Sequence, residues 1–128
     1  MFQPVATFSG FSVDDIDAAK DFYTNVLGLE AEDSMGGIRL SLPGGQTVFV
    51  YAKDGHQPAT YTTLNFVVTD IDGAVEALQG NGVTFERYDG MAQDEKGIMR
   101  GIAAQRGPDI AWFTDPAGNI LAVLQQPE

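Results

Sequence analysis

The chain repeats one short pattern at an interval of 55 residues. Phe11, Val13, Asp15, Ile16, Asp17 and Ala19 recur as Phe66, Val68, Asp70, Ile71, Asp72 and Ala74. In both copies a β-prone stretch runs into an aspartate suited to cap a helix, and apolar residues then follow at helical spacing. The repeat therefore predicts two copies of one supersecondary unit.

Glycine and proline divide each copy into further segments. The first copy is expected to contain strands near residues 5–13, 30–35, 38–42 and 46–51, and the second near 62–68, 83–88, 98–105, 110–114 and 120–125. Helices are expected from Ile16 to Leu27 and from Ile71 to Leu78. We therefore expect an α+β fold of two tandem βαβββ modules within a single domain, residues 1–128. Module 1 covers about 4–52, a polar connector covers 53–61, and module 2 covers about 62–126.

The last two apolar runs flank a polar tip, Asp115-Pro116-Ala117-Gly118-Asn119. Proline favours the second position of a turn, and glycine and asparagine tolerate positive φ. The sequence from residue 110 to 125 therefore predicts a β-hairpin.

Composition excludes several classes of function. The formal net charge of −11 disfavours nucleic acid, because the protein would repel phosphate groups. Cysteine is absent, which rules out disulfides, thiolate metal sites and thiol catalysis. No apolar run is long enough to cross a membrane, and the start of the chain does not have the features of a signal peptide. A cytoplasmic location and no membrane partner are therefore expected.

Two stretches resemble signatures of the vicinal oxygen chelate superfamily, which includes glyoxalase I, extradiol dioxygenases, fosfomycin-resistance enzymes and bleomycin-resistance proteins. DIDAAKDFYTNVLGLE (residues 15–30) is similar to its first-helix signature, and WFTDPAGNILAV (residues 112–123) is similar to its Asp-Pro-x-Gly-Asn hairpin. The resemblance implies a curved, partly closed mixed sheet with helices on the convex side and a ligand cavity on the concave side. It also implies a homodimer.

Metal-dependent members of that superfamily carry histidine, glutamine or glutamate on the first and last strands of each module. The matching positions here are Phe8, Phe49, Thr63 and Ala122, none of which is a useful metal ligand. The single histidine, His56, lies in the connector. We therefore predict that the protein has no metal and no cofactor.

Side chains alternate between the two faces of a strand, so these four positions define the cavity face. Matching Pro43 to Pro116, an offset of 73, adds Arg39 and Trp112 to that face. The predicted ligand-binding residues are Arg39, Trp112, Phe8, Phe49, Tyr51, Thr63, Asn65 and Ala122. They suit a small planar or apolar ligand with a carboxylate or carbonyl for Arg39. Alternatively, Phe8, Phe49 and Trp112 fill the cavity, and Arg39 lies at its rim, in water or paired with a carboxylate.

Two functions remain open. The first is a metal-free small-molecule binding protein of the glyoxalase and bleomycin-resistance type, for which the acidic field favours cationic ligands although Arg39 favours anions. The second is a glyoxalase-, lyase- or dioxygenase-like enzyme with a displaced or absent metal site. A cluster formed by Glu86, Glu95, His56 or Gln105 would support the enzyme. Asp94 and Glu95 beside Lys96 could form a lid, although a solvated loop is the simpler interpretation.

Overall fold

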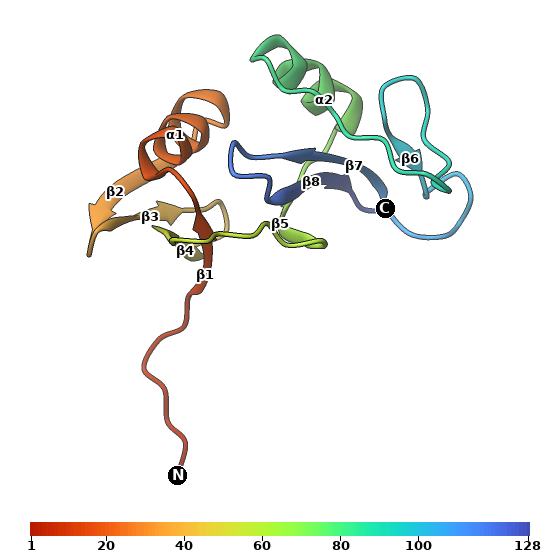
Figure 1. Ribbon diagram of the computed structural model, residues 1–128. Helices are drawn as coiled ribbons and strands as arrows, with labels where there is room; N and C mark the ends of the chain where they lie inside the picture. The colour runs from red at the N-terminus through yellow and green to blue at the C-terminus, as the bar shows by residue number, and fades with distance from the viewer. The chain divides into compact units, whose positions relative to one another are not determined.

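The computed structural model describes residues 1–128, which form two compact units (Figure 1). The first unit is Met1–Pro58 and the second is Ala59–Glu128. The boundary between them falls inside the predicted connector. Each unit contains one module with its own sheet and its own helix.

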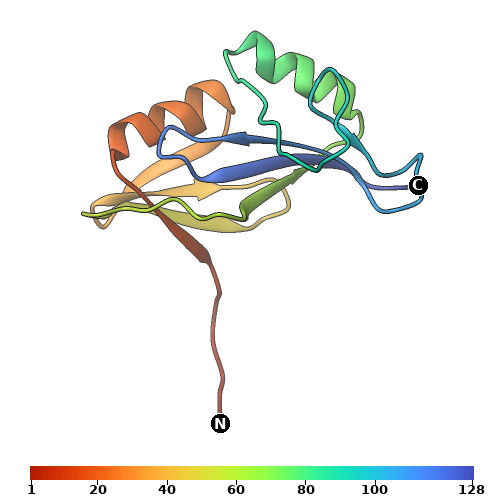
Figure 2. The ribbon, with the colours of Figure 1, turned by 45° about the vertical axis from the view of Figure 1, so that its right-hand side comes forward.

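The first unit contains β1 (Ser9–Val13), α1 (Ile16–Asp21), η1 (Phe22–Val26), β2 (Glu30–Ser34), β3 (Gly37–Ser41) and β4 (Thr47–Ala52). Its four strands lie in the order β1-β4-β3-β2. β1 pairs with β4 in parallel, and the other neighbours are antiparallel. Helix α1 lies across one face of this sheet (Figure 2).

The second unit contains β5 (Thr62–Val67), α2 (Ile71–Gly80), β6 (Met99–Arg100), β7 (Asp109–Thr114) and β8 (Ile120–Gln125). Its strand order is β5-β8-β7-β6, with β5 parallel to β8. Helix α2 covers β7 and β8. The same arrangement therefore occurs twice, and the expected α+β fold of two βαβββ modules is confirmed.

The strand registers of the two modules are equivalent residue by residue. Gly10 lies opposite Phe49 in the first sheet, and Asn65 lies opposite Ala122 in the second. These pairs are related by the offsets read from the sequence, 55 for the first strand and 73 for the last. The third strands agree as well, because the pair Arg39 and Phe49 corresponds to the pair Trp112 and Ala122.

Aspartates at equivalent positions begin the two helices, and apolar residues hold them against the sheets. The Asp15 carboxylate accepts hydrogen bonds from the backbone of Asp17 and Ala18, and Asp70 accepts one from Gly73. Beneath the helices lie the buried residues Val13, Ile38, Leu40, Val48, Val50, Ile71, Val75, Ala111, Phe113, Leu121 and Val123. Burying one large aliphatic side chain contributes about 1.5–3 kcal/mol, so this face supplies most of the stability of each module.

The first helix does not continue to Leu27 as an α-helix. After Asp21 it widens into a π-helical turn, η1, in which the Leu27 N–H donates to the Phe22 carbonyl at 3.0 Å. Tyr23 within this turn is fully buried and contacts the rings of Phe11 and Phe22. The wide turn places this large ring in the core, which helical spacing in the sequence does not reveal.

Three expected strands are shorter than predicted or absent. Residues 1–8 have no strand partner, so the first strand begins only at Ser9. Residues 83–88 form no strand, and their one backbone hydrogen bond to the β7 edge runs from the Glu86 N–H to the Trp112 carbonyl, at 2.7 Å. The expected strand 98–105 is reduced to β6, because the chain turns at Gly101 and Gln105 has a φ of 55°.

The difference in residue number between equivalent positions of the two modules is 55 before the helix and 73 after it. Module 2 therefore contains 18 residues (73 minus 55) that module 1 lacks. These residues lie between α2 and β7. In the first module a tight turn at Met35 and Gly36 connects β2 to β3. In the second module, residues 86–97 run between α2 and β6, and residues 101–108 connect β6 to β7.

The predicted hairpin is present, and a buried polar pair builds its tip. Asp115 is 4% exposed and Asn119 is 2% exposed. The Asp115 carboxylate accepts from the backbone N–H groups of Ala117 and Asn119, both at 2.9 Å, and from the Asn119 side-chain amide at 3.0 Å. A positive φ of 86° at Gly118 lets the chain turn back.

Replacing Asp115 with alanine should lower the free energy of unfolding by about 2–4 kcal/mol, because buried N–H groups lose their acceptor. Urea denaturation followed by circular dichroism measures the change. Asp54→Ala, at an exposed turn, is the control and should behave like the wild type. Equal stability of the two variants would show that the buried carboxylate does not hold the hairpin.

Candidate functional site

The four positions that match the superfamily's metal ligands do not fit a metal ion. Phe8 and Phe49 have no donor atom, and Ala122 is completely buried. The Thr63 hydroxyl donates to the Ile120 carbonyl at 3.0 Å. No group of three or more histidine, aspartate or glutamate side chains lies close enough to hold a metal. We therefore derive no reaction step through a metal.

The first module has a cavity of about 260 Å³ on the sheet face that points away from α1. It is lined by Phe8, Ser34, Met35, Arg39 and Phe49. Tyr51 lies beside it, with its ring stacked on that of Phe49 at 5.8 Å between centroids. Three predicted ligand residues, Phe8, Phe49 and Arg39, are thus brought together, although Phe8 precedes β1 and is 70% exposed.

Arg39, the one cationic residue in the lining of this cavity, is already in an ion pair. The Arg39 guanidinium lies 2.6 Å from a carboxylate oxygen of Glu32, which is opposite it on β2. The two side chains are 49% and 64% exposed. Solvent and salt screen a pair this exposed, so an anionic ligand could replace Glu32 at small cost.

The second module has its own cavity, of about 230 Å³, and its walls are mainly aromatic. The lining residues are Thr60, Tyr61, Thr62, Tyr88, Met91, Trp112 and Ile120. Trp112 is the repeat equivalent of Arg39, so the same strand position carries an indole in one module and a guanidinium in the other. No lining residue is charged, which makes this cavity suitable for a flat ring.

Tyr88 forms the wall beside Trp112. Its ring meets the indole edge to face at 5.6 Å between centroids, and Trp112 is only 8% exposed. The Tyr88 hydroxyl is buried and has no hydrogen-bond partner. Burial, followed by the negative charge of Glu86, raises the pKa of this phenol above its usual value, so the phenol stays protonated.

Besides Tyr51, three predicted ligand residues are absent from the lining of both cavities. Ala122 is buried, the Thr63 hydroxyl is bound to the backbone, and Asn65 is exposed on β5. Ala122 is opposite Trp112 in the sheet, so the indole lies next to it on the same face.

His56 is not isolated in the connector. Its Nδ1 lies 2.7 Å from the Ser12 hydroxyl oxygen of β1, and its backbone N–H donates to the Lys53 carbonyl. This contact fixes the connector to the edge of the first sheet. Within the second unit, neither Glu86 nor Glu95 belongs to a group of three or more histidine, aspartate or glutamate side chains that could hold a metal.

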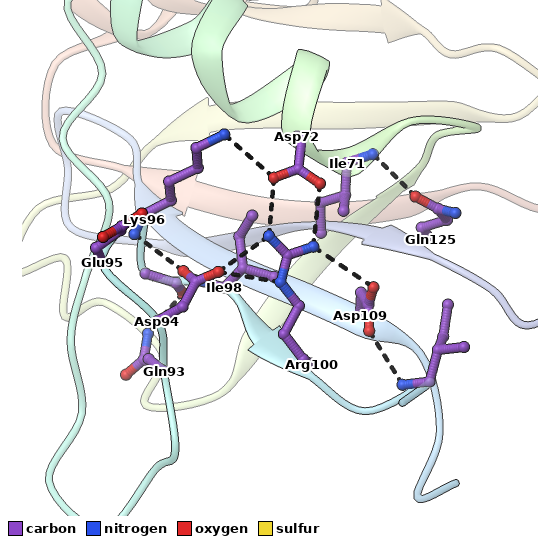
Figure 3. A network of polar contacts seen from close by, with 12 residues as sticks. Ile71, Asp72, Gln93, Asp94, Glu95, Lys96, Ile98, Arg100, Asp109 and Gln125 are labelled. Carbon is purple, nitrogen blue, oxygen red and sulfur yellow. Dashed lines mark hydrogen bonds and ion pairs between the residues drawn. The ribbon is translucent and has the colours of Figure 1, made fainter. Parts of the chain in front are cut away.

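A network of ion pairs joins the first turn of α2 to the residues around β6 (Figure 3). Asp72, in the first turn of α2, binds Arg100 at 2.8 Å and Lys96 at 3.2 Å. Arg100 also binds Asp94 at 3.0 Å, and its guanidinium is 3.7 Å from Asp109. Lys96 reaches Glu76 of α2 at 2.9 Å.

The network keeps its carboxylates charged. Hydrogen bonds from Arg100 and Lys96 hold the pKa of Asp72 far below its usual range. For Asp94, burial opposes ionisation, but the backbone N–H groups of Ile98 and Lys96 and the Arg100 side chain lower its pKa overall. Depressed carboxyl pKa values stabilise the fold above the ordinary carboxyl range, and this contribution is lost as the pH falls into strong acid.

Comparison with known proteins agrees with the fold. A family model described as Glyoxalase/Bleomycin resistance protein/Dioxygenase superfamily matches residues 5–123. The chain belongs to this superfamily. No curated protein matches the chain in sequence. No helix of this superfamily member is long and apolar enough to span a membrane.

Several solved structures are similar to this chain over nearly its whole length. One is TnmS3, an antibiotic binding protein from Streptomyces sp. CB03234, with 20% identity, a TM-score of 0.65, and 98% of this chain and 99% of that chain covered. A superfamily member from Sphaerobacter thermophilus has 27% identity, a TM-score of 0.65, and coverage of 94% and 98%. The fosfomycin resistance protein FosX from Listeria monocytogenes has 16% identity, a TM-score of 0.67, and coverage of 97% and 94%.

Strand alternation did not identify most of the second cavity's lining. Tyr61 and Thr60 lie in the predicted connector, and Tyr88 and Met91 lie in the extra residues of module 2. One signal was present in the sequence: tyrosine and methionine, both large side chains, interrupt an otherwise polar, glycine-containing stretch. Their contact with Trp112 depends on a path between α2 and β7 that periodicity does not specify.

Arg39→Ala and Trp112→Ala change equivalent positions and should lower stability by very different amounts. Losing Arg39 should change the free energy of unfolding by less than about 1 kcal/mol, since the pair with Glu32 is exposed. Losing Trp112 should cost about 3–5 kcal/mol, since a buried ring leaves a void. Urea denaturation followed by circular dichroism measures both. Similar costs for the two variants would contradict the exposed environment of Arg39 and the buried environment of Trp112.

Proposed function

We propose that this superfamily member is a metal-free small-molecule binding protein that holds a flat ligand on the sheet face away from the helices. The observation that carries the proposal is the replacement of metal-ligand positions by Phe8, Phe49 and Ala122 beside cavities with aromatic walls. The antibiotic-binding neighbour shares the fold, which supports a binding role for such a face.

The two cavities favour different ligands. The first offers the Phe49 and Tyr51 rings and a guanidinium that an acidic group could take from Glu32. The second offers Tyr61, Tyr88 and Trp112 with no charged group in its lining. An overall charge of −11 favours cationic or neutral ligands there, because aromatic faces attract cations. The preference of Arg39 for an anionic ligand thus applies to the first cavity, and the preference of the net negative charge for a cationic or neutral ligand applies to the second.

Each cavity is smaller than the roughly 300–1,000 Å³ typical of drug-sized ligand sites. A compact aromatic molecule fits this size better than a large one. A second copy of the chain could enlarge either hollow, and we retain the expectations of a homodimer and of a cytoplasmic location as part of the proposal. Light scattering of the purified protein tests the dimer.

Purified protein should contain no stoichiometric Zn²⁺, Mn²⁺ or Ni²⁺, and titration with each ion should show no tight binding, because suitable ligands do not converge. Elemental analysis and calorimetry make these measurements. Tight binding at one ion per chain would overturn the metal-free proposal and favour the glyoxalase- or lyase-like alternative.

A thermal-shift screen should include aromatic acids and cationic aromatic antibiotics. For aromatic acids, Arg39→Ala should weaken binding, and for cationic or neutral rings, Tyr61→Ala should weaken it by about three- to tenfold, as expected for loss of one aromatic contact. Each variant serves as the control for the other. If no hit responds to either substitution, the ligand does not occupy these cavities.

A further inference from the structure

Residues 86–97, which we call the strap, cross the aromatic cavity of the second module. The Glu86 N–H at one end bonds to the Trp112 carbonyl, and the other end leads into Ile98, which is fully buried. Between these ends, Tyr88 and Met91 form part of the cavity wall. The strap belongs to the stretch that module 1 lacks, so the fold itself does not require it.

The strap is internally ordered by one side chain. The Gln93 amide accepts from the Tyr88 N–H at 2.9 Å and donates to the carbonyls of Glu86 and Gly97 at 3.0 and 2.8 Å. These three bonds span the strap from one end to the other. It can therefore move as a unit without losing its internal hydrogen bonds.

Charged side chains hold the strap to the helix. Lys96 of the strap binds Asp72 of α2, and Asp94 of the strap is joined to Asp72 through Arg100 (Figure 3). Lys96 also binds Glu76 of α2. The side chains of Asp72, Lys96 and Arg100 are 30–44% exposed. Ion pairs at this exposure are individually weak and are screened by salt, so the attachment can be reversed.

One group opposes the closed position. The buried Tyr88 hydroxyl has no partner, and an unsatisfied buried hydroxyl destabilises the arrangement that buries it. Moving the strap outward would expose this hydroxyl to water and uncover the edge of Trp112. The closed position therefore depends on the ion pairs on one side and is opposed by Tyr88 on the other.

We infer that the strap is a gate over the aromatic cavity, held shut by Asp72 through Lys96 and Arg100, and that Tyr88 is its movable wall. The inference rests on the proposed function, because it identifies the second-module cavity as the site that the gate regulates. Weakening the ion pairs opens the cavity to flat aromatic ligands, and removing the Tyr88 hydroxyl favours the closed position.

Trp112 provides a readout that needs no ligand, because it is the only tryptophan of the chain and lies beneath Tyr88. Asp72→Asn should raise the acrylamide quenching constant of Trp112 by at least about twofold, as expected when local opening exposes a buried ring. Amide hydrogen exchange in residues 88–97 should also become faster. Asp17→Asn, the repeat equivalent of Asp72 in α1, is the matched control and should change neither measurement.

Two further conditions keep the test decisive if Asp72→Asn folds poorly. Sodium chloride at high concentration should raise Trp112 quenching in the wild type, and Lys96→Gln should act in the same direction as Asp72→Asn. Tyr88→Phe should lower quenching or leave it at the wild-type value, and it should raise the unfolding midpoint. Wild-type quenching and exchange in Asp72→Asn and Lys96→Gln, with no salt effect, would overturn the gate.

The gate and the proposed function can fail separately. If a ligand quenches Trp112 but binds and dissociates at the same rates in wild type and Asp72→Asn, the binding function stands and the gate is wrong. If the quenching and exchange results appear as expected but no ligand binds, the gate stands as a motion and the binding function is wrong. Faster association and dissociation in Asp72→Asn support both.

Discussion

Parallel pairing between the first and last strands of each module is the constraint on which the rest of the structure depends. Parallel neighbours cannot be joined by a tight turn, so the chain must cross over before it returns. Here the crossover contains α1 or α2, and the helix buries one face of its sheet. The opposite face is left without a helical cover, and both cavities are found there.

Because the two modules share one strand register, their buried and uncovered sheet faces can be compared position by position. Positions opposite each other in the first sheet, Arg39 and Phe49, become Trp112 and Ala122 in the second. The buried face keeps aliphatic residues at the equivalent positions because both helices need the same packing. The uncovered face has no such requirement, and it carries an ion pair in one module and an aromatic wall in the other.

Local patterns predicted the fold well. The two offsets, the helix caps and the hairpin tip each depend on neighbouring residues, and the structure contains all of them. The prediction of a strand at 83–88 was wrong, because alternation of side chains does not supply a neighbouring strand to pair with. β7 makes a single backbone hydrogen bond with that segment, at Glu86. The pairing of Arg39 with Glu32 was left open as one of two alternatives, since it depends on the register of β2. The position of Tyr88 over Trp112 could not be predicted, because it depends on the path of an insertion.

The first module connects β2 to β3 with a turn of only two residues. Met35 and Gly36, at φ values of 50° and 81°, join β2 to β3 in a tight turn. The entropy of closing a loop grows only slowly with its length, and both strands are already fixed by their ladders. This turn is therefore a natural graft point, where an inserted segment could be displayed beside Phe49 without disturbing the core. The duplicated scaffold therefore has two places where a segment can be inserted beside a cavity. Only the second module carries such an insertion, between α2 and β7.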